Sequence, residues 1–457
     1  MRRGGNRQVL ERLVSLVTET RFGDLPPFAV RAAQAFLTDS LAVGVAGRLH
    51  PHRDAVAGVA SGWGEGDDAR VLGDALRLPA AAAAFLNAYQ VHCLEFDCVH
   101  EPAVAHAMTA VAPAALAECE RGASPVHGRD LLNALVLGVE VTSLLGLAAT
   151  APLTFFRPAT AGVFGAAAAV GALRGFDAAP MRDCLGHALA QAAGTMQAHE
   201  EGKPTLPLQI AGAARAGLVA ADLAAAGIPA PRHSLEGRYG YFRLFEESWD
   251  AENLVRGLGD TWQVTRLSLK PWPCGRATHG GIAGVLKLRA QGVTAANLAK
   301  LNLTAPPLIH QLVIRPPRLG MDVNYARLCF AYVGAVALCE GRVGLEHFTP
   351  ERLDDSGIQA VAGRIGAELH ASPDPSAFLP QTLTAELADG SSRTVAIDAL
   401  PGSPDCLLDE AACRAKAAAC LAGVYGGSGR AEALADAVAG LPGAADASPI
   451  LDPVTGE

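Results

Sequence analysis

Residues 80–116, AAAAAFLNAYQVHCLEFDCVHEPAVAHAMTAVAPAAL, contain the pattern that decides the fold. Two alanine-rich apolar runs, each long enough for several helical turns, flank a polar interval between His92 and His106. Runs that are apolar nearly all round are typical of helices packed inside a bundle. The polar interval holds three histidines and three carboxylates within fifteen residues. Burying such groups is costly unless they are paired, so the interval is a candidate acid–base site.

The helical pattern extends through the N-terminal half of the chain. Apolar residues recur at spacings of three and four, and glycine and proline mark the gaps. We predict helices over residues 9–19, 27–46, 80–95, 103–121, 128–149, 161–173, 179–198 and 208–226. The chain has 457 residues, of which 50% are hydrophobic and only 5% aromatic, which favours close-packed helices over a sandwich or barrel.

The pattern changes near Thr265. A proline-rich loop begins at Lys270, residues 311–314 alternate like a strand, and residues 382–387 and 394–397 flank Asp389-Gly390 as in a hairpin. Helical segments are expected over 281–289, 325–340, 356–366, 409–422 and 429–439. The predicted fold is therefore mainly α, with a large helical domain (1–266 and 403–457) and a smaller α+β lid domain (267–402) inserted before the C-terminal helices. A ligand site is expected at their junction.

Charge and composition exclude several classes of function. The net charge of −9 gives no reason to expect binding to nucleic acid or to an anionic membrane surface. The ten cysteines form no CxxC pair, which argues against a zinc ribbon or a redox dithiol. Residues 1–6 do not lead into a signal peptide, and we expect no run of about 18 apolar residues that spans a membrane. The sequence predicts a cytoplasmic protein with reduced cysteines.

Within the polar interval, the residues differ in what they suggest. His92 and Glu101 are interpreted as members of a solvated loop. His106 opens the second apolar run, and the residues alone leave two interpretations equally open: a hydrogen-bonded core histidine or an acid–base group. No regular ligand spacing such as HExxH occurs, so no metal site is predicted.

A second polar group runs from Lys270 to His279 and reads KPWPCGRATH. The prolines stiffen a loop, and His279 then begins a helix, whose free N–H groups suit an anionic ligand. The same dipole lowers the pKa of a nearby histidine and keeps it neutral, as a base requires. The simpler interpretation of Lys270 and Arg276 is surface charge.

Two further segments carry charge. Arg157 precedes a helix of small residues, where it can bind a carboxylate bidentately, although a solvent-facing arginine is the simpler interpretation. Residues 199–205, HEEGKPT, are interpreted as an exposed linker that contains Lys203. The glycines at 162, 165 and 212 do not follow a strand, so they make no dinucleotide fingerprint.

Several short stretches together resemble the MmgE/PrpD family, and they run in order through nearly the whole chain. They are LTDSLAVG from Leu37, AFLNAYQVHCLEFD from Ala84 with His106 following, GRDLL from Gly128 with GVEV from Gly138, RPATAGVFGAA from Arg157, AARAG from Ala213, LEGRYG from Leu235, KPWPC from Lys270 with His279, and AYVGA from Ala331 with Gly341.

The resemblance implies a helical domain with an α+β lid, a homodimer, and a pocket for small di- or tricarboxylates that works without metal or organic cofactor. It implies active-site roles for His106, His279 and Tyr332. Asp97 matches the second acid of the family's aspartate run, and Glu95 stands where its first aspartate is usual.

This chain also departs from the family pattern. Arg157-Pro158 stands where members commonly have His-Pro, Leu206 where they commonly carry a lysine, and Cys98 where they have the last acid of the run. These differences point to a divergent substrate or, alternatively, to a site that has lost catalysis.

The chemistry that the resemblance implies is proton transfer at a carbon beside a carboxylate. It requires a base near neutral pKa, a counter-acid and cations for the spectator carboxylates. We assign His106 and His279 to proton transfer without saying which is the base. Tyr332 donates to the developing oxyanion, and Asp97 or Glu95 orients a histidine. The substrate-binding candidates are Glu95, Arg157, Lys203 and Lys270. The expected function is a lyase that dehydrates or decarboxylates, with an isomerase or epimerase and a metabolite-binding homologue as alternatives.

Overall fold

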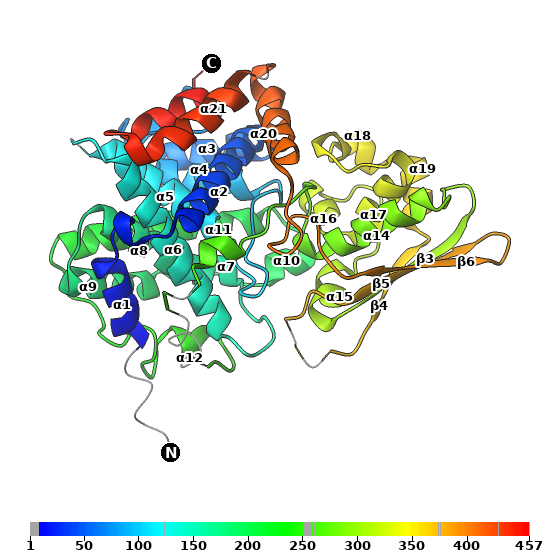
Figure 1. The fold of residues 1–457 in the computed structure, drawn as a ribbon, viewed down its shortest axis with the longest axis horizontal. Helices are drawn as coiled ribbons and strands as arrows, with labels where there is room; N and C mark the ends of the chain where they lie inside the picture. Colours follow the sequence, from blue (N-terminus) through cyan, green and yellow to red (C-terminus); the bar gives the residue numbers. More distant parts are fainter. Residues whose placement is uncertain are drawn as a thin grey trace.

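Helices rich in alanine and leucine form the larger part of the molecule (Figure 1). The computed structural model describes residues 9–122, 124–250, 258–259, 261–372, 374, 376–427 and 429–456. Residues 1–6, which bear on the signal-peptide question, lie outside these ranges. Within them, most residues in regular structure are helical and the strands form only two small sheets, so the prediction of a mainly α protein is confirmed.

The first hydrophobic core is built from the N-terminal helices together with the two at the C-terminus. The helices are α1 (Val9–Glu19), α2 (Pro27–Ala46), α3 (Arg53–Ser61), α4 (Ala80–His92), α5 (Ala107–Arg121), α6 (Gly128–Ala148), α7 (Arg157–Thr160), α8 (Gly162–Leu173), α9 (Ala178–Ala190), α10 (Gln197–Glu201), α11 (Thr205–Ala225), α12 (Tyr241–Phe245), α20 (Glu410–Tyr425) and α21 (Gly429–Gly440). A two-stranded ribbon, β1 (Ala69–Arg70) with β2 (Arg77–Leu78), lies beside them. Helices α20 and α21 pack against α2 in Figure 1, although they follow the second core in sequence.

Small residues bring the central helices close together. Helices α4, α5, α6, α8 and α11 contact one another around the middle of this core. At the crossing of α6 and α8, a Cβ placed on Gly165 would lie 1.9 Å from Thr142 Oγ1 and 2.4 Å from the Gly138 carbonyl oxygen. No larger residue fits there, which explains why this part of the sequence is rich in alanine and glycine.

The central position of α6 also corrects an expectation about membrane spans. Two described helices, α6 and α11, are long and apolar enough to cross a membrane by length and composition, whereas we expected none. The most apolar window of α6 is 89% buried inside the protein, and that of α11 is 56% buried. A helix at the centre of a bundle needs apolar residues on every side, so it passes the same test as a membrane helix.

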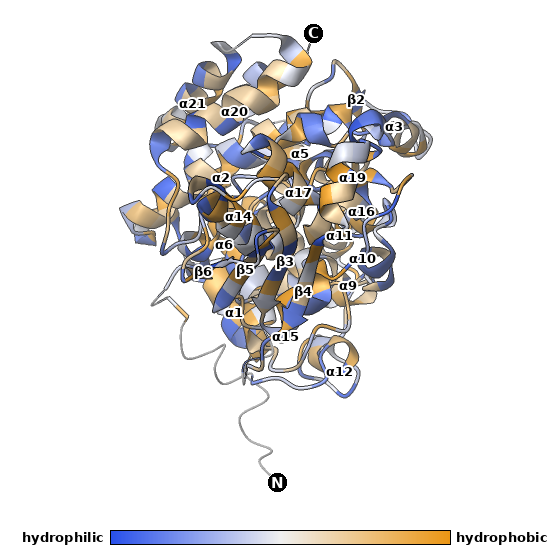
Figure 2. Ribbon diagram, turned by 90° about the vertical axis from the view of Figure 1, so that its right-hand side faces the viewer, coloured by the Kyte–Doolittle hydropathy of each residue, from blue (hydrophilic) through white to orange (hydrophobic). Residues whose placement is uncertain are grey.

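The second hydrophobic core spans Cys274 to Leu400. Its sheet has the order β4-β3-β5-β6, in which β3 (Leu298–Ala305) pairs in parallel with β4 (Ile365–Leu369) and antiparallel with β5 (Gln381–Leu387), which pairs with β6 (Ser392–Ile397). The helices are α14 (His279–Ala290), α15 (Pro307–Val313), α16 (Val323–Arg327), α17 (Phe330–Glu340), α18 (Pro350–Leu353) and α19 (Ser356–Ala362). Helices α14 and α17 pack on the sheet, whose alternating hydropathy is visible in Figure 2.

Several 3₁₀ turns connect these elements. They are Phe22–Asp24, Gly47–Leu49, Gln263–Arg266, Arg276–Thr278, Leu345–His347, Leu441–Gly443 and Ser448–Val454. The turn at Arg276–Thr278 leads directly into α14, so that His279 is the first residue of that helix, as predicted.

The structure corrects local predictions in the second core. Residues 311–314 were expected as a strand, but they fall in and just after helix α15, which Pro307 starts at its first position. The expected helix 356–366 ends at Ala362, and strand β4 follows because Ile365 pairs with Leu301. Four alternating residues were too few to separate strand from helix. The hairpin around Asp389-Gly390 is confirmed as β5 and β6.

The helices that flank the polar interval are shorter than expected. Helix α4 ends at His92 rather than at 95, and α5 begins at Ala107 rather than at 103, with His106 as its N-cap residue. The residues between the two helices form an irregular loop in which His100 and Ala105 exchange backbone hydrogen bonds. The loop therefore leaves His106 at the entrance of α5.

One buried carboxyl gives a stability prediction. Glu140 of α6 is fully buried, its Oε2 accepts from the Gln263 backbone N–H at 2.7 Å, and its Oε1 has no partner among the described residues. Burial raises the pKa of Glu140 to about 8. The folded protein therefore binds a proton that the unfolded chain releases above about pH 4.5, so stability is lost as pH rises toward 8.

We expect Glu140→Gln to stabilise the protein increasingly between pH 5 and pH 8, by about 2–4 kcal/mol at the upper end. Urea unfolding of both proteins at several pH values measures this difference, and other titrating groups cancel in the comparison. A difference that does not change with pH would show that Glu140 is already ionised in the folded state.

Candidate active site

A small, partly open cavity of about 70 Å³ lies where residues of both cores meet. It has room for about five water molecules, which is less than a di- or tricarboxylate needs. The polar side chains that line it are Glu95, His106, His199, Arg276 and Thr278. The apolar side chains are Val99, Val104, Leu153, Phe156, Pro158, Met196, Leu206, Ala277, Leu312, Leu328 and Phe378, and Gly275 completes the lining.

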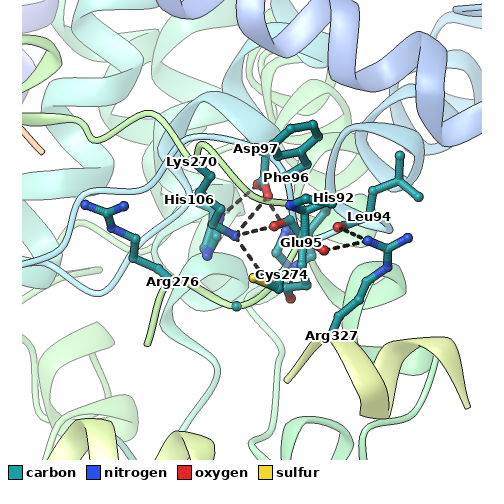
Figure 3. Close-up of polar contacts among 12 residues, drawn as sticks. His92, Leu94, Glu95, Phe96, Asp97, His106, Lys270, Cys274, Arg276 and Arg327 are labelled. Atoms are coloured by element: carbon teal, nitrogen blue, oxygen red, sulfur yellow. Dashed lines mark hydrogen bonds and ion pairs between the residues drawn. The ribbon is translucent and has the colours of Figure 1, made fainter. Parts of the chain in front are cut away.

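Asp97 organises the polar interval (Figure 3). Its Oδ2 accepts hydrogen bonds from His106 Nδ1 at 2.8 Å, from His92 Nδ1 at 3.0 Å and from the Thr109 hydroxyl. An ionised carboxylate can only accept, so both imidazoles donate through Nδ1. In the neutral form of His106 this assignment leaves Nε2 unprotonated, on a side chain that lines the cavity and is 12% exposed. One carboxylate thus fixes the tautomer of two histidines.

The environments of the two histidines drive their pKa values apart. Burial lowers the pKa of His106 below its ordinary value, despite the opposing effect of Asp97. For His92 burial acts in the same direction, but Asp97 and Glu95 together outweigh it and raise its pKa. Burial also opposes ionisation of Asp97, yet the charges of His106 and His92 hold its pKa well below the usual range. The environment thus favours the charged form of His92 and the neutral form of His106, as a base requires.

Lys270 is the cation closest to these acids. It is fully buried, and its Nζ lies 3.0 Å from Glu95 Oε2 and 3.7 Å from Asp97 Oδ1. Although burial would raise the pKa of Glu95, Lys270 is the main influence that lowers it to about 2. Glu95 and the cavity-lining Val104 both have left-handed backbone angles, φ 50° and φ 49°. Such angles are uncommon outside glycine and concentrate at functional sites.

Arg276 presents a guanidinium at the cavity wall. Its Nε donates to Glu101 Oε1 at 2.7 Å, and its Nη1 donates to the Pro401 carbonyl at 2.7 Å. His279 lies behind it: its Nδ1 accepts from Arg276 Nη1 at 3.2 Å, and its Nε2 donates to the Cys274 carbonyl at 3.2 Å. Burial and the nearby Arg276 hold the pKa of His279 well below its ordinary range. Both nitrogens of His279 are therefore occupied, and His279 does not line the cavity.

His199 belongs to the site, although its segment was expected to be an exposed linker. It lines the cavity, and its Nδ1 accepts from Arg315 Nη2 at 2.9 Å. Burial and Arg315 lower the pKa of His199 to about 3, so the imidazole is neutral. No local pattern pointed to this residue, because its contact with Arg315 joins segments that are 116 residues apart.

Arg157 is placed differently from expectation. It is buried, and its Nε and Nη2 form a bidentate ion pair with Glu246 at 3.0 and 3.1 Å. Its Nη1 donates to the Ala103 carbonyl at 3.1 Å. The guanidinium is thus already paired, and it holds the loop that precedes His106. The expectation that Arg157 binds a substrate carboxylate is corrected by this ion pair.

Two more predicted residues lie away from the cavity. Tyr332 is fully buried in the second core, where its hydroxyl donates to the His347 carbonyl at 2.6 Å. Lys203 is exposed and does not line the cavity. Neither side chain is brought to His106 in this structure, because Tyr332 packs inward beside Phe348 and Lys203 points to solvent.

His92 was wrongly interpreted as a solvated residue. It is 1% exposed, and its ring lies edge-on to that of His106 with centroids 4.7 Å apart. His100, also buried, interacts with Gln263 through Nε2 at 3.0 Å, and Glu101 pairs with Arg276. The spacing of His92 and Asp97 across the end of α4 was the available signal, but periodicity alone could not distinguish a buried loop from a solvated one.

The donor atoms of His92, Asp97 and His106 lie within 4.8 Å of one another, a spacing that can accommodate a metal ion. In this structure both imidazoles instead use the Nδ1 hydrogen to reach a single oxygen of Asp97. With Nδ1 of each imidazole bonded to Asp97, the Nε2 atoms are the nitrogens that remain as lone-pair donors.

The fold and the site define a class: a protein with a large helical core and a smaller α+β core that together enclose an acid–base cavity. The family models identify it further. The MmgE/PrpD N-terminal domain matches residues 11–253 and the MmgE/PrpD C-terminal domain matches residues 272–440, so the chain belongs to the MmgE/PrpD family. The second match extends over α20 and α21, which pack on the first core.

Characterised relatives cover nearly the whole chain. A cis-aconitate decarboxylase-like protein of Aspergillus oryzae is 28% identical over 98% of this chain and 98% of its own length. The cis-aconitate decarboxylase of Aspergillus terreus is 26% identical over 94% of this chain and 92% of its own. That of Mus musculus is 26% identical over 87% and 83%.

Proposed function

We propose that this protein is a lyase that acts on a small carboxylated substrate, by decarboxylation or dehydration. The observation that carries the proposal is the state of His106, whose Nδ1 donates to Asp97 while its other nitrogen belongs to a side chain that lines the cavity. The relatives that carry the name cis-aconitate decarboxylase support the lyase class.

The charges around the cavity favour an anionic substrate. The buried cations are Lys270, Arg276, Arg315 and Arg327, and the neighbouring carboxylates are those of Glu95, Asp97 and Glu101. This is an excess of one positive charge, before any proton on His92 is counted. We place a substrate carboxylate near the N-terminal end of α14, where the helix dipole attracts an anion and Arg276, although paired with Glu101, adds positive charge.

The proposed chemistry moves one proton through His106 Nε2. In dehydration, Nε2 removes the proton beside the carboxylate, the electron pair expels the hydroxyl group, and the proton now on Nε2 passes to that group, so that water leaves and His106 is neutral again. In decarboxylation, the bond to the leaving carboxylate breaks, its electron pair stays on the substrate carbon, and protonated Nε2 then supplies the proton. Asp97 stabilises the imidazolium in both cases. These residues supply the base and the cations, so the proposal needs no metal or organic cofactor.

The roles of the other residues follow from their contacts. We propose that His279 positions Arg276 rather than carrying the proton, since both its nitrogens are occupied. The smaller domain is proposed to act as a lid, because a cavity of about 70 Å³ must open to admit a tricarboxylate. That the protein is a cytoplasmic homodimer remains a prediction from the sequence.

The apolar part of the wall bears on the substrate. Leu206 lines the cavity at the position where the family resemblance places a lysine, and Leu153 and Leu312 line it too. A wall with one cation fewer favours a substrate with fewer carboxylates or with an alkyl substituent. We therefore expect an alkyl-substituted acid to be turned over with a higher kcat/KM than cis-aconitate.

The test is incubation with cis-aconitate and with a panel of alkyl-, hydroxy- and imino-substituted di- and tricarboxylates in D₂O, followed by NMR. Loss of CO₂ or of water from any of them supports a lyase. Deuterium exchange beside a carboxylate without net loss replaces the proposal by an isomerase or epimerase. Binding shifts without exchange would mean a metabolite-binding protein that has lost catalysis.

The pH dependence of kcat/KM is expected to contain one ionisation below pH 6.5, because burial lowers the pKa of His106. A dehydratase needs neutral His106, so its activity is lost as pH falls through that pKa. A decarboxylase that must deliver a proton loses activity as pH rises through the same pKa. Rates between pH 4.5 and 8.5 distinguish the two, and a profile whose only ionisation lies above pH 7 would contradict the assignment of His106.

A further inference from the structure

Three consecutive peptide carbonyls before Asp97 each accept a hydrogen bond from a different buried cation. Arg327 Nη1 donates to the Leu94 carbonyl at 3.0 Å, Lys270 Nζ to that of Glu95 at 3.0 Å, and Lys416 Nζ to that of Phe96 at 2.8 Å. Figure 3 shows Lys270 and Arg327 reaching this segment from different sides. Arg327 belongs to α16, Lys270 to the linker between the cores and Lys416 to α20. These three segments are far apart in sequence.

The segment needs such partners because it has no regular structure. Helix α4 ends at His92, one turn bond joins the Glu95 N–H to the His92 carbonyl, and the next β-bridge pairs Val99 with Ser268. Between them the chain turns through the left-handed angle of Glu95. Buried carbonyls outside helices and sheets must be satisfied in another way, and bonds from charged donors are the stronger kind.

Lys416 makes two contacts in addition to its bond to the Phe96 carbonyl. Its Nζ pairs with Asp39 Oδ1 of α2 at 2.6 Å and lies 4.1 Å from the centre of the Phe96 ring. The side chain is only 6% exposed, which is rare for lysine. Lys416 therefore connects helix α20 to Phe96, the residue that immediately precedes Asp97.

Arg327 provides the connection to the second core. It ends α16, is 3% exposed, and donates from Nη1 to both the Leu94 and the Pro273 carbonyls. Its guanidinium lies 4.1 Å from the centre of the Phe348 ring, which belongs to the second core. The bond to Leu94 thus exists only when the second core is seated against the first.

We propose that Lys416 and Arg327 are positioning residues that, with Lys270, clamp the Leu94–Phe96 backbone so that Asp97 meets His106 Nδ1. Seating of the smaller domain then completes the clamp through Arg327, and the correct tautomer of His106 depends on it. The inference rests on the proposed function in one respect: the tautomer of His106 affects turnover only if His106 carries the proton in the proposed reaction. The tautomer itself can be measured without a substrate.

The experiment uses the full-length protein labelled with ¹⁵N-histidine, without substrate. The His106 signals are identified by their loss in His106→Gln. We expect wild-type His106 to carry its proton on Nδ1. We expect Arg327→Met, and separately Lys416→Met combined with Asp39→Asn, to shift His106 toward the Nε2–H tautomer, with kcat at least about tenfold lower on a substrate found above. Asp39→Asn is included because Lys416→Met alone would leave Asp39 as an unpaired buried charge.

Arg174→Met is the matched control, because it also removes a partly buried arginine from an ion-pair network, with Glu118 and Asp222, away from the cavity. Lys416→Gln and Arg327→Gln shorten the side chain and remove the charge but stay polar, and they replace the methionine variants if those fail to fold. An unchanged His106 tautomer in the folded variants at both positions would overturn the proposal, as would an equal shift in Arg174→Met. A tautomer shift in a protein that turns over no tested acid would instead contradict the proposed function alone.

Discussion

Asp97→Asn is expected to lower kcat by about a thousandfold or more, because asparagine cannot serve both histidines. Asp97 Oδ2 accepts from His106, His92 and Thr109 at once, and it is fully buried. An amide places either an N–H or a neutral carbonyl at this point, so His106 can adopt the wrong tautomer and its imidazolium loses a counter-charge. Steady-state kinetics of the purified variant measure the effect.

Thr109→Val provides the control for Asp97→Asn. It removes one donor to the same oxygen but leaves the carboxylate and both imidazole contacts in place. We expect it to lower kcat by about tenfold or less, in line with the loss of one hydrogen bond. If Asp97→Asn proves no more harmful than Thr109→Val, Asp97 supports the loop and does not control the protonation of His106.

His106→Gln is expected to lower kcat by about a hundredfold or more while the protein stays folded, because it removes the group that carries the proton. The side chain is partly exposed at the cavity, and its ring contacts Asp97 and His92. Circular dichroism and thermal unfolding check the fold, and turnover of the best acid from the panel measures the effect.

His279→Gln separates the two histidines that the sequence placed together. Because His279 contacts Arg276 and the Cys274 carbonyl, its loss is expected to raise KM more than it lowers kcat. The opposite result, a large fall in kcat with KM unchanged, would return His279 to the proton-transfer step. Near-normal activity in both His106→Gln and His279→Gln would contradict the proposed mechanism.

The sequence was most informative where a pattern is local. The helices over 9–19 and 27–46 were predicted with the bounds that α1 and α2 have, because apolar spacing and proline at the first position of α2 are local signals. The hairpin at Asp389-Gly390 was equally local. Strand β3, by contrast, was missed, since its pairing with β4 and β5 lies far away in the chain.

The candidate site shows the same division. His106, Asp97, Glu95 and Lys270 were singled out because polar residues between apolar runs are conspicuous, and the structure brings these four together. Arg157 was singled out from its position before a helix and Tyr332 from the family resemblance, and their partners turned out to be Glu246 and a backbone carbonyl. Their contacts span 89 and 15 residues, which no local pattern reveals.

By itself, then, the sequence determined that the chain is mainly helical and that residues 92–106 and 270–279 are polar where their surroundings are apolar. Only the tertiary structure decided which histidine has a free nitrogen at the cavity and which cation holds which carbonyl. Lys416 and Phe96 are 320 residues apart, and Arg327 and Leu94 are 233 apart. Periodicity records which residues are buried, whereas protonation depends on the distances between buried charges, and those distances exist only in the folded chain.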